Sequence, residues 1–103
     1  MSTTHNLKCW PEPFAAVASG IKTFEVRVDD LPYAVGDTLI LREWCPDLYK
    51  DAIADGSSQE EAMDFAYTGA TCAVRVAYCW RGAPLLPPGL VAMAVVRGDA
   101  DAP

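Results

Sequence analysis

Apolar and polar residues alternate along several stretches of this chain, as they do in strands that have one buried face. The longest such stretch is residues 71–80, where one predicted face holds Cys72, Val74, Val76, Tyr78 and Trp80. Similar patterns predict strands at residues 22–28, 38–44 and 90–97, and a short strand near Leu7. Because a single helix is expected between the first two strands, the order predicts an α+β fold, built as a small mixed β-barrel.

The expected first helix is short. Residues 10–13, Trp-Pro-Glu-Pro, suit a first helical turn, because prolines are tolerated there and an acid favours the positive end of the helix dipole. Phe14 and Val17 then share one face, and Gly20 stands where a glycine commonly ends a helix. We expect a helix of roughly two turns, which places Lys22 at the start of the next strand.

Strand 22–28 has the most distinctive polar pattern of the chain. Its apolar members are predicted to enter the core: Phe24, Val26 and Val28. Thr23, Glu25 and Arg27 then share the opposite face, with Lys22 beside them. An acid between two cations can orient both, so this strip is the first candidate for a binding site. Pairing across neighbouring strands at the surface is the competing interpretation.

Residues 47–66 are predicted to form an acidic insertion with helical stretches, because Cys45-Pro46 ends the preceding strand. Within the insertion, Ser58 and Glu61 stand three positions apart, as in a capping box at the start of a helix. We interpret the insertion as a solvated decoration of a barrel loop, and a functional lid is the alternative.

A length of 103 residues, of which 51% are hydrophobic, suits one globular domain over residues 1–103. Residues 98–103 are predicted to be a disordered tail. No apolar run approaches the roughly 18 to 20 residues that a membrane helix needs. We therefore expect no membrane partner and a cytoplasmic location.

The cysteines give no sign of a metal centre. The four of them include no Cys-x-x-Cys pair, and the chain has one histidine, so a zinc cluster is not expected. We predict free thiols, no metal and no cofactor. Cys72 and Cys79 differ by an odd number along one strand, which predicts that they point to opposite faces.

The formal net charge of −6 argues against binding along duplex nucleic acid, because phosphate binding depends on Lys and Arg. The acids are unevenly placed, however. Residues 47–64 hold six acids and one lysine, and the tail adds Asp99 and Asp101. The rest of the chain is close to neutral, so its cations can cluster locally. A pocket for a nucleotide or a short single strand fits this distribution.

Five motifs stand along the chain in a fixed order. Residues 20–27 read Gly-x-Lys-x-x-Glu-x-Arg, and residues 35–44 give a Val-Gly-Asp turn followed by an apolar strand. The other three are His-x-Leu-Lys at 5–8, Tyr-Thr-Gly at 67–69 and Gly-Leu-Val-x-Met at 89–93. Together they resemble the ASCH domain of the PUA-like superfamily, especially its small bacterial and phage members. The resemblance implies a PUA-like barrel and a cleft between the first helix and the barrel.

In that superfamily the cleft is associated with RNA or modified nucleobases, so the resemblance implies a binding module for RNA or a modified nucleoside or nucleotide. Our candidate ligand-binding residues are His5, Lys8, Lys22, Thr23, Glu25, Arg27, Glu43, Trp44 and Tyr67. The aromatic members are candidates for base stacking, whereas Trp80 is interpreted as structural. Glu43 is predicted to face inward and to need a cationic partner, for which the candidates are Lys8, Lys22 and Arg75.

Two other functions remain open. One ASCH branch hydrolyses the acetyl amide of acetylated cytidine with a lysine, a threonine and a glutamate. Lys22 matches that lysine, but Glu25 stands at the threonine position, and residues 84–89 replace the segment with the glutamate. A small hydrolase acting on such a nucleoside or on RNA, with Lys22 and Glu25 as its catalytic residues, is the alternative. The third interpretation is a phage-type protein-interaction domain, whose binding to a basic partner would be lost on deleting residues 47–64.

Overall fold

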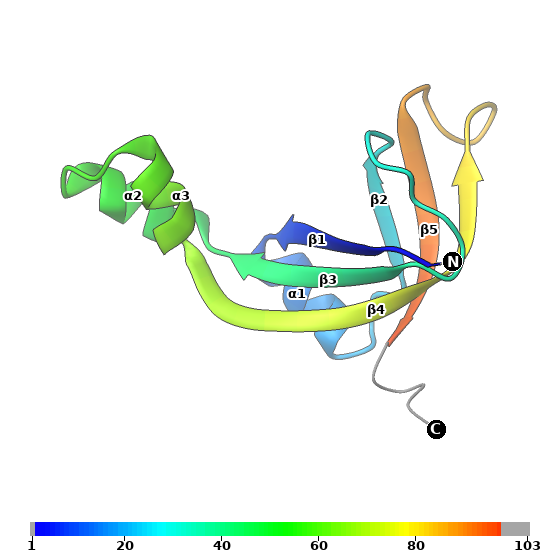
Figure 1. Cartoon of the computed structure of the whole chain (residues 1–103), viewed down its shortest axis with the longest axis horizontal. Coiled ribbons are helices and arrows are strands. Elements are labelled where there is room, and N and C mark those ends of the chain that lie inside the picture. The colour runs from blue at the N-terminus through cyan, green and yellow to red at the C-terminus, as the bar shows by residue number, and fades with distance from the viewer. Residues whose placement is uncertain (1, 98–103) are drawn as a thin grey trace.

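A computed structural model describes residues 2–97, which form five strands and three helices. One sheet with strand order β1-β3-β4-β5-β2 curls into a half-barrel (Figure 1). The elements are β1 (Thr4–Cys9), α1 (Pro11–Ala18), β2 (Phe24–Val28), β3 (Thr38–Trp44), α2 (Pro46–Ala54), α3 (Gln59–Phe65), β4 (Tyr67–Arg81) and β5 (Leu90–Arg97). The predicted α+β class and the predicted strands are confirmed. Residues 98–103, for which we predict disorder, lie outside the described part of the chain.

The long strand β4 connects the two halves of the sheet. Its first part pairs antiparallel with β3, and its second part pairs antiparallel with β5. A bulge interrupts the β4–β5 pairing between Val76 and Tyr78, and bulges increase the local twist of a strand. Strand β1 runs parallel to β3, so β1 and β2 form the two edges of the sheet. Within residues 2–97, no helix is long and apolar enough to cross a membrane.

The core lies between the curled sheet and α1. Its most deeply buried side chains come from three strands and include Leu39, Leu41, Val74, Val76, Val91 and Met93. Helix α1 adds Phe14 and Val17, which confirms the predicted apolar face of this helix. Its N-terminal Pro11 and the positive φ of Gly20, 84°, also agree with the predicted start and end.

Strand β2 presents the opposite face to the one we predicted. Glu25 is 3% exposed, whereas Phe24, Val26 and Val28 are exposed on the outer side. The pairing with β5 explains this, because Glu25 lies opposite the buried Met93, and directly paired residues share a face. The edge position of β2 allows its inward face to be polar, since this face borders the seam with β1.

Strand β4 also differs from a regular alternation. Up to Val76 the predicted inward face is confirmed, but beyond the bulge Tyr78 and Trp80 lie outside. Trp80 is therefore exposed at the protein surface and is not a core residue. Cys79 packs against the core cluster that contains Cys72, so the prediction that these two cysteines point to opposite faces is wrong. Within the described residues, none of the four cysteines forms a disulfide bond.

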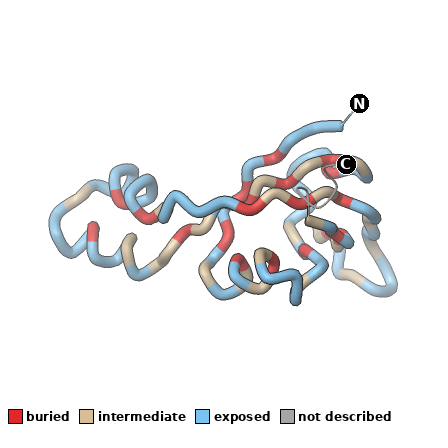
Figure 2. Tube along the Cα trace, turned by 90° about the horizontal axis from the view of Figure 1, so that it is seen from below, coloured by how far each residue is buried: buried red, intermediate tan, exposed pale blue. Residues whose placement is uncertain are grey.

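Helices α2 and α3 form a hairpin that extends from the ends of β3 and β4 (Figure 1). In Figure 2 this hairpin projects from the rest of the chain and is mostly exposed. The buried residues of its helices are Ala52 and Ala62. The indole Nε1 of Trp44 donates a hydrogen bond of 3.0 Å to the carbonyl of Met63 and so ties α3 to β3. The predicted acidic, partly helical segment is confirmed.

The capping box of α3 is confirmed as well and gives a stability prediction. The Ser58 hydroxyl accepts a bond of 3.1 Å from the Glu61 amide, and the Glu61 carboxylate accepts one of 2.9 Å from the Ser58 amide. Ser58→Ala removes the cap and is expected to cost about 1 kcal/mol, measured by thermal unfolding in circular dichroism. Ser57→Ala is the matched control, and an equal loss in both variants would contradict the capping role.

Candidate functional site

A pocket of about 410 Å³ lies at the seam where the sheet fails to close between β1 and β2. The end of β1, the start of α1 and β2 supply its lining, which is Lys8, Cys9, Trp10, Pro13, Lys22, Glu25, Val26 and Arg27. Four of the nine predicted ligand-binding residues are in this lining: Lys8, Lys22, Glu25 and Arg27. The pocket therefore has an excess of two positive charges before any ligand binds.

The Glu25 carboxylate organises the polar side of the pocket. It accepts a hydrogen bond of 2.6 Å from Lys22 Nζ at one oxygen and one of 3.1 Å from Arg27 Nε at the other. The carboxylate itself is buried, while the side chains of Lys22 and Arg27 are 21% and 24% exposed. The buried carboxylate thus fixes both cations, and both still reach solvent. Groups that bind an anionic or carbonyl oxygen of a ligand need both properties.

Arg27 also bridges the open seam. Its Nη1 donates a hydrogen bond of 3.1 Å to the backbone carbonyl of Lys8 on β1. This contact joins the two edge strands, which have no backbone pairing with one another in the described sheet. One guanidinium therefore stabilises the floor of the pocket and the closure of the half-barrel.

The local backbone explains how Lys22 reaches this position. After α1 ends, Gly20 adopts a positive φ and its amide bonds the carbonyl of Val17 at 3.0 Å. The Lys22 amide then bonds the carbonyl of Ala16 at 3.0 Å, which returns the chain to the helix end before β2 begins. The Lys22 ammonium lies 4.8 Å from the centre of the Phe24 ring, a cation–π distance.

Four lining residues were missed by the sequence reasoning: Cys9, Trp10, Pro13 and Val26. Trp10 is 56% exposed at the pocket although it is a large aromatic residue. A signal for it existed, because alternation along β1 places Lys8 and Trp10 on one side. Burial raises the pKa of the Cys9 thiol, and the nearby charge of Glu25 raises it further, so Cys9 is not an activated nucleophile.

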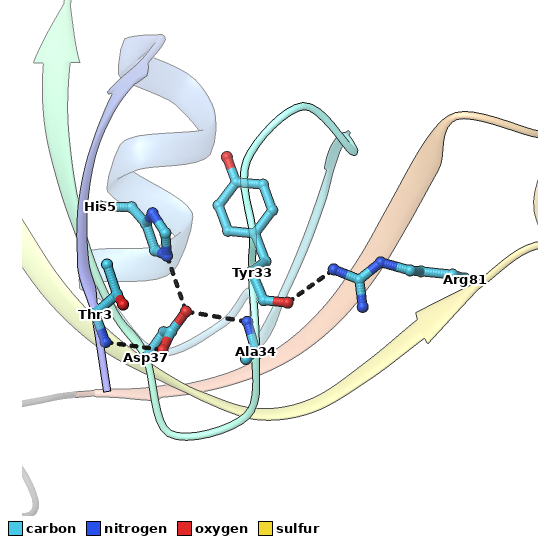
Figure 3. A network of polar contacts seen from close by, with 6 residues as sticks. All are labelled: Thr3, His5, Tyr33, Ala34, Asp37 and Arg81. Carbon is cyan, nitrogen blue, oxygen red and sulfur yellow. Dashed lines mark hydrogen bonds and ion pairs between the residues drawn. The ribbon is translucent and has the colours of Figure 1, made fainter. Parts of the chain in front are cut away.

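His5 lies outside the pocket and belongs to a separate buried network (Figure 3). Its Nε2 donates a hydrogen bond of 2.8 Å to the Asp37 carboxylate, and its ring lies 4.9 Å from that of Tyr33. His5, a predicted ligand-binding residue, is therefore not part of the pocket lining. The Val-Gly-Asp turn explains the arrangement, since Gly36 with φ 95° directs Asp37 toward β1.

Glu43 does not pair with any of the three predicted cations. Its carboxylate accepts a hydrogen bond of 2.8 Å from the hydroxyl of Thr68. The parallel register places Glu43 beside the buried Cys9, on the face of Leu39 and Leu41, and a bulge in the β3–β4 pairing lies between Arg42 and Trp44. Glu43 is absent from the lining of the pocket.

The other candidates have structural contacts. Trp44 is buried, although Lys8 Nζ lies 4.3 Å above its ring and links it to the pocket. The guanidinium of Arg42 lies 4.0 Å from the ring centre of Tyr67. The backbone carbonyl of Thr23 accepts a hydrogen bond from the amide of Val95. None of Trp44, Tyr67 and Thr23 lines the pocket. Within residues 2–97, no group of three or more His, Cys, Asp or Glu side chains is placed to hold a metal ion.

A family model described as a domain of unknown function, DUF3850, matches residues 4–95. The chain belongs to the DUF3850 family. The matched range starts with β1, ends within β5 and includes every residue that lines the pocket of this DUF3850 domain. Comparison with curated proteins gives no match.

Proposed function

We propose that this DUF3850 domain is an ASCH-like member of the PUA-like superfamily that recognises RNA or a modified nucleoside or nucleotide in the pocket at the β1–β2 seam. The half-barrel and the position of the Gly-x-Lys-x-x-Glu-x-Arg strand support the likeness. The domain presents the cations of this strand beside an opening, as a ligand-binding module requires.

One observation carries the proposal: a buried carboxylate holds two partly exposed cations at a pocket with an exposed tryptophan. Glu25 fixes Lys22 and Arg27, so these groups lose little conformational entropy when they bind an oxygen of the ligand. Trp10 offers an aromatic face on which a base can stack, worth roughly 1 to 3 kcal/mol. A volume of about 410 Å³ lies within the range usual for small-molecule pockets.

The charge distribution is consistent with a small ligand and with a short single strand. Lys8, Lys22 and Arg27 provide local positive charge against Glu25, whereas none of the lining residues comes from the acidic α2–α3 hairpin. A few phosphate contacts are available here, but a long track for duplex nucleic acid is not.

Titration of isotope-labelled protein with nucleosides, nucleotides and short RNAs tests the proposal. Lys22→Ala removes a charge-assisted hydrogen bond worth roughly 1.5 to 3 kcal/mol, so we expect binding to weaken about tenfold to a hundredfold. Lys50→Ala on α2 is the matched control, because Lys50 is an exposed lysine outside the pocket. Equal affinities for both variants, or no binding by the wild type, would overturn the proposed function.

A second candidate is a small hydrolase that acts on an acetylated cytidine-type nucleoside or on RNA. The short contact of 2.6 Å between Lys22 Nζ and Glu25 Oε2 favours it, because a carboxylate at hydrogen-bond distance can exchange a proton with the amine. Chromatography of the ligand after the titration separates the two functions. Unchanged ligand supports the binding module, and a product that disappears with Lys22→Ala supports the hydrolase.

A further inference from the structure

The outer side of β2, β5 and the end of β4 carries an apolar surface, of which only Val26 also lines the pocket of the proposed function. We call it the outer face and define it by Phe24 and Val26 of β2, Ala92 and Ala94 of β5, and Tyr78 and Trp80 of β4. Phe24 is 54% exposed, Tyr78 is 55% exposed and Trp80 is 38% exposed. Exposure of three neighbouring aromatic side chains on one sheet face requires an explanation.

The strand pairing determines the shape of the outer face. Ala94 is paired with Phe24 on one side and Tyr78 on the other. In the next row, Ala92 is paired with Val26 and Trp80. Two ridges of large side chains therefore flank a central row of alanines, and the ridges are roughly 10 Å apart because neighbouring strands are about 4.8 Å apart.

We propose that the outer face binds a second copy of this chain in a two-fold symmetric dimer. Two such surfaces can fit together when one copy is shifted by the width of one strand relative to the other. The β2 ridge of each copy then fills the alanine trough of the other, which buries the aromatic side chains in a sheet-on-sheet packing.

The surface has the size of a small dimer interface. Large aromatic side chains bury roughly 150 to 250 Å² each, so three half-exposed ones with their aliphatic neighbours present several hundred Å². A biological interface should bury at least roughly 1,000 Å² in total, which is about 500 Å² from each partner. Val28, 60% exposed beside Val26 on the same side of β2, extends the surface further.

The charges permit the same arrangement. None of the six residues of the outer face is charged, although the whole chain has a net charge of −6. The acidic α2–α3 hairpin lies at the opposite end of the long axis from β2 and β5 (Figure 1). Two copies joined through the outer face can therefore keep their acidic hairpins apart.

Nucleic acid is the less suitable occupant. Aromatic residues on a sheet can stack bases, but phosphate binding requires Lys or Arg, and half of the outer face consists of valine and alanine. An uncharged, largely aliphatic surface is better matched by another copy of itself. The ligand pocket thus uses the polar side chains of β2, and the outer face uses its apolar ones, with Val26 at the border of both.

Ala94→Glu tests the dimer at the centre of the trough. Ala94 is exposed, so the charge is tolerated in the monomer, but a dimer would bury two glutamates close together. Ala70→Glu is the matched control, because Ala70 is an exposed alanine of β4 that has no partner on β5 in the described pairing. Sedimentation velocity over a concentration series measures association.

We expect the wild type and Ala70→Glu to dimerise alike, and the dissociation constant of Ala94→Glu to rise about 100-fold or more. A monomeric wild type at every concentration would overturn the proposal, as would equal dimerisation of all three proteins. Binding of a single-stranded oligonucleotide that is lost in Ala94→Glu, with a monomeric wild type, would assign the outer face to nucleic acid instead. If circular dichroism shows that Ala94→Glu is unfolded, Val28→Lys replaces it with the same expectation.

Discussion

Asp37→Ala is expected to lower the free energy of unfolding by roughly 3 to 5 kcal/mol, because it removes one partner of a buried, hydrogen-bonded pair. The Asp37 carboxylate accepts bonds from the Thr3 amide at 2.9 Å, the Ala34 amide at 3.0 Å and His5 Nε2 at 2.8 Å (Figure 3). Alanine leaves these donors without their acceptor and separates the 29–37 loop from β1. Urea unfolding followed by circular dichroism measures the loss.

Asp30→Ala is the control, since Asp30 is an exposed acid of the same loop. Its effect is expected to stay within about 0.5 kcal/mol, as for most surface substitutions. A comparable loss in both variants would mean that the stability comes from the loop charge and not from the buried network. The free energy of unfolding of a domain of this size is only about 5 to 15 kcal/mol. Asp37→Ala is therefore expected to leave a measurable unfolded fraction.

The same carboxylate gives the stability a pH dependence of defined sign. Burial by itself raises the pKa of Asp37, but the bonds from Thr3, His5 and Ala34 outweigh it and hold the pKa below its ordinary value of 3.8. A group with a lowered folded-state pKa stabilises the protein above its unfolded pKa, and this contribution is lost as the pH falls through the folded pKa. The stability difference between the wild type and Asp37→Asn should therefore shrink as the pH falls below 3.8.

The parts of the fold that sequence could predict are those set by local signals. Pro11 and Gly20 mark the two ends of α1, and both act within one helical turn. Ser58 and Glu61 likewise cap α3 through contacts three residues apart. Such signals depend on neighbouring residues alone and are readable without knowledge of the sheet.

The inward face of β2 was not predictable in the same way. Alternation from Phe24 to Val28 shows that the strand has an apolar and a polar face, but it does not show which one meets the core. The pairing of Glu25 with Met93 decides this, and it depends on a strand almost seventy positions later. The bulge after Val76 reverses the face of Trp80 for a similar reason, because it arises in the pairing with β5.

The candidate site was predicted where it follows from a single strand. Lys22, Glu25 and Arg27 lie within six residues and meet in one network. Trp10 was missed because its position before Pro11 indicates a helix start, and its spacing of two from Lys8 is a weak signal without the pocket that β2 completes. His5 was misplaced because its partner Asp37 is brought to it only by the loop before β3.

Glu25→Ala is expected to weaken both stability and ligand binding, because one carboxylate holds two cations at the seam. Removing the partner of a buried ion pair costs roughly 3 to 5 kcal/mol, and we expect about 2 to 3 kcal/mol here because Lys22 and Arg27 remain partly exposed. In a domain of this length such a loss lowers the melting temperature by roughly 8 to 24 °C. Thermal unfolding in circular dichroism measures it.

Glu43→Ala provides the matched control, since Glu43 is a strand glutamate outside the pocket whose carboxylate accepts a hydrogen bond from the Thr68 hydroxyl. Its effect should be below about 1 kcal/mol. Glu25→Gln separates charge from shape: it keeps an acceptor oxygen but not the negative charge that draws Lys22 and Arg27 together. If Glu25→Ala and Glu43→Ala melt at the same temperature, Glu25 does not organise the pocket. If Glu25→Ala is destabilised yet binds ligand as well as the wild type, the cations hold the half-barrel closed and the ligand binds elsewhere.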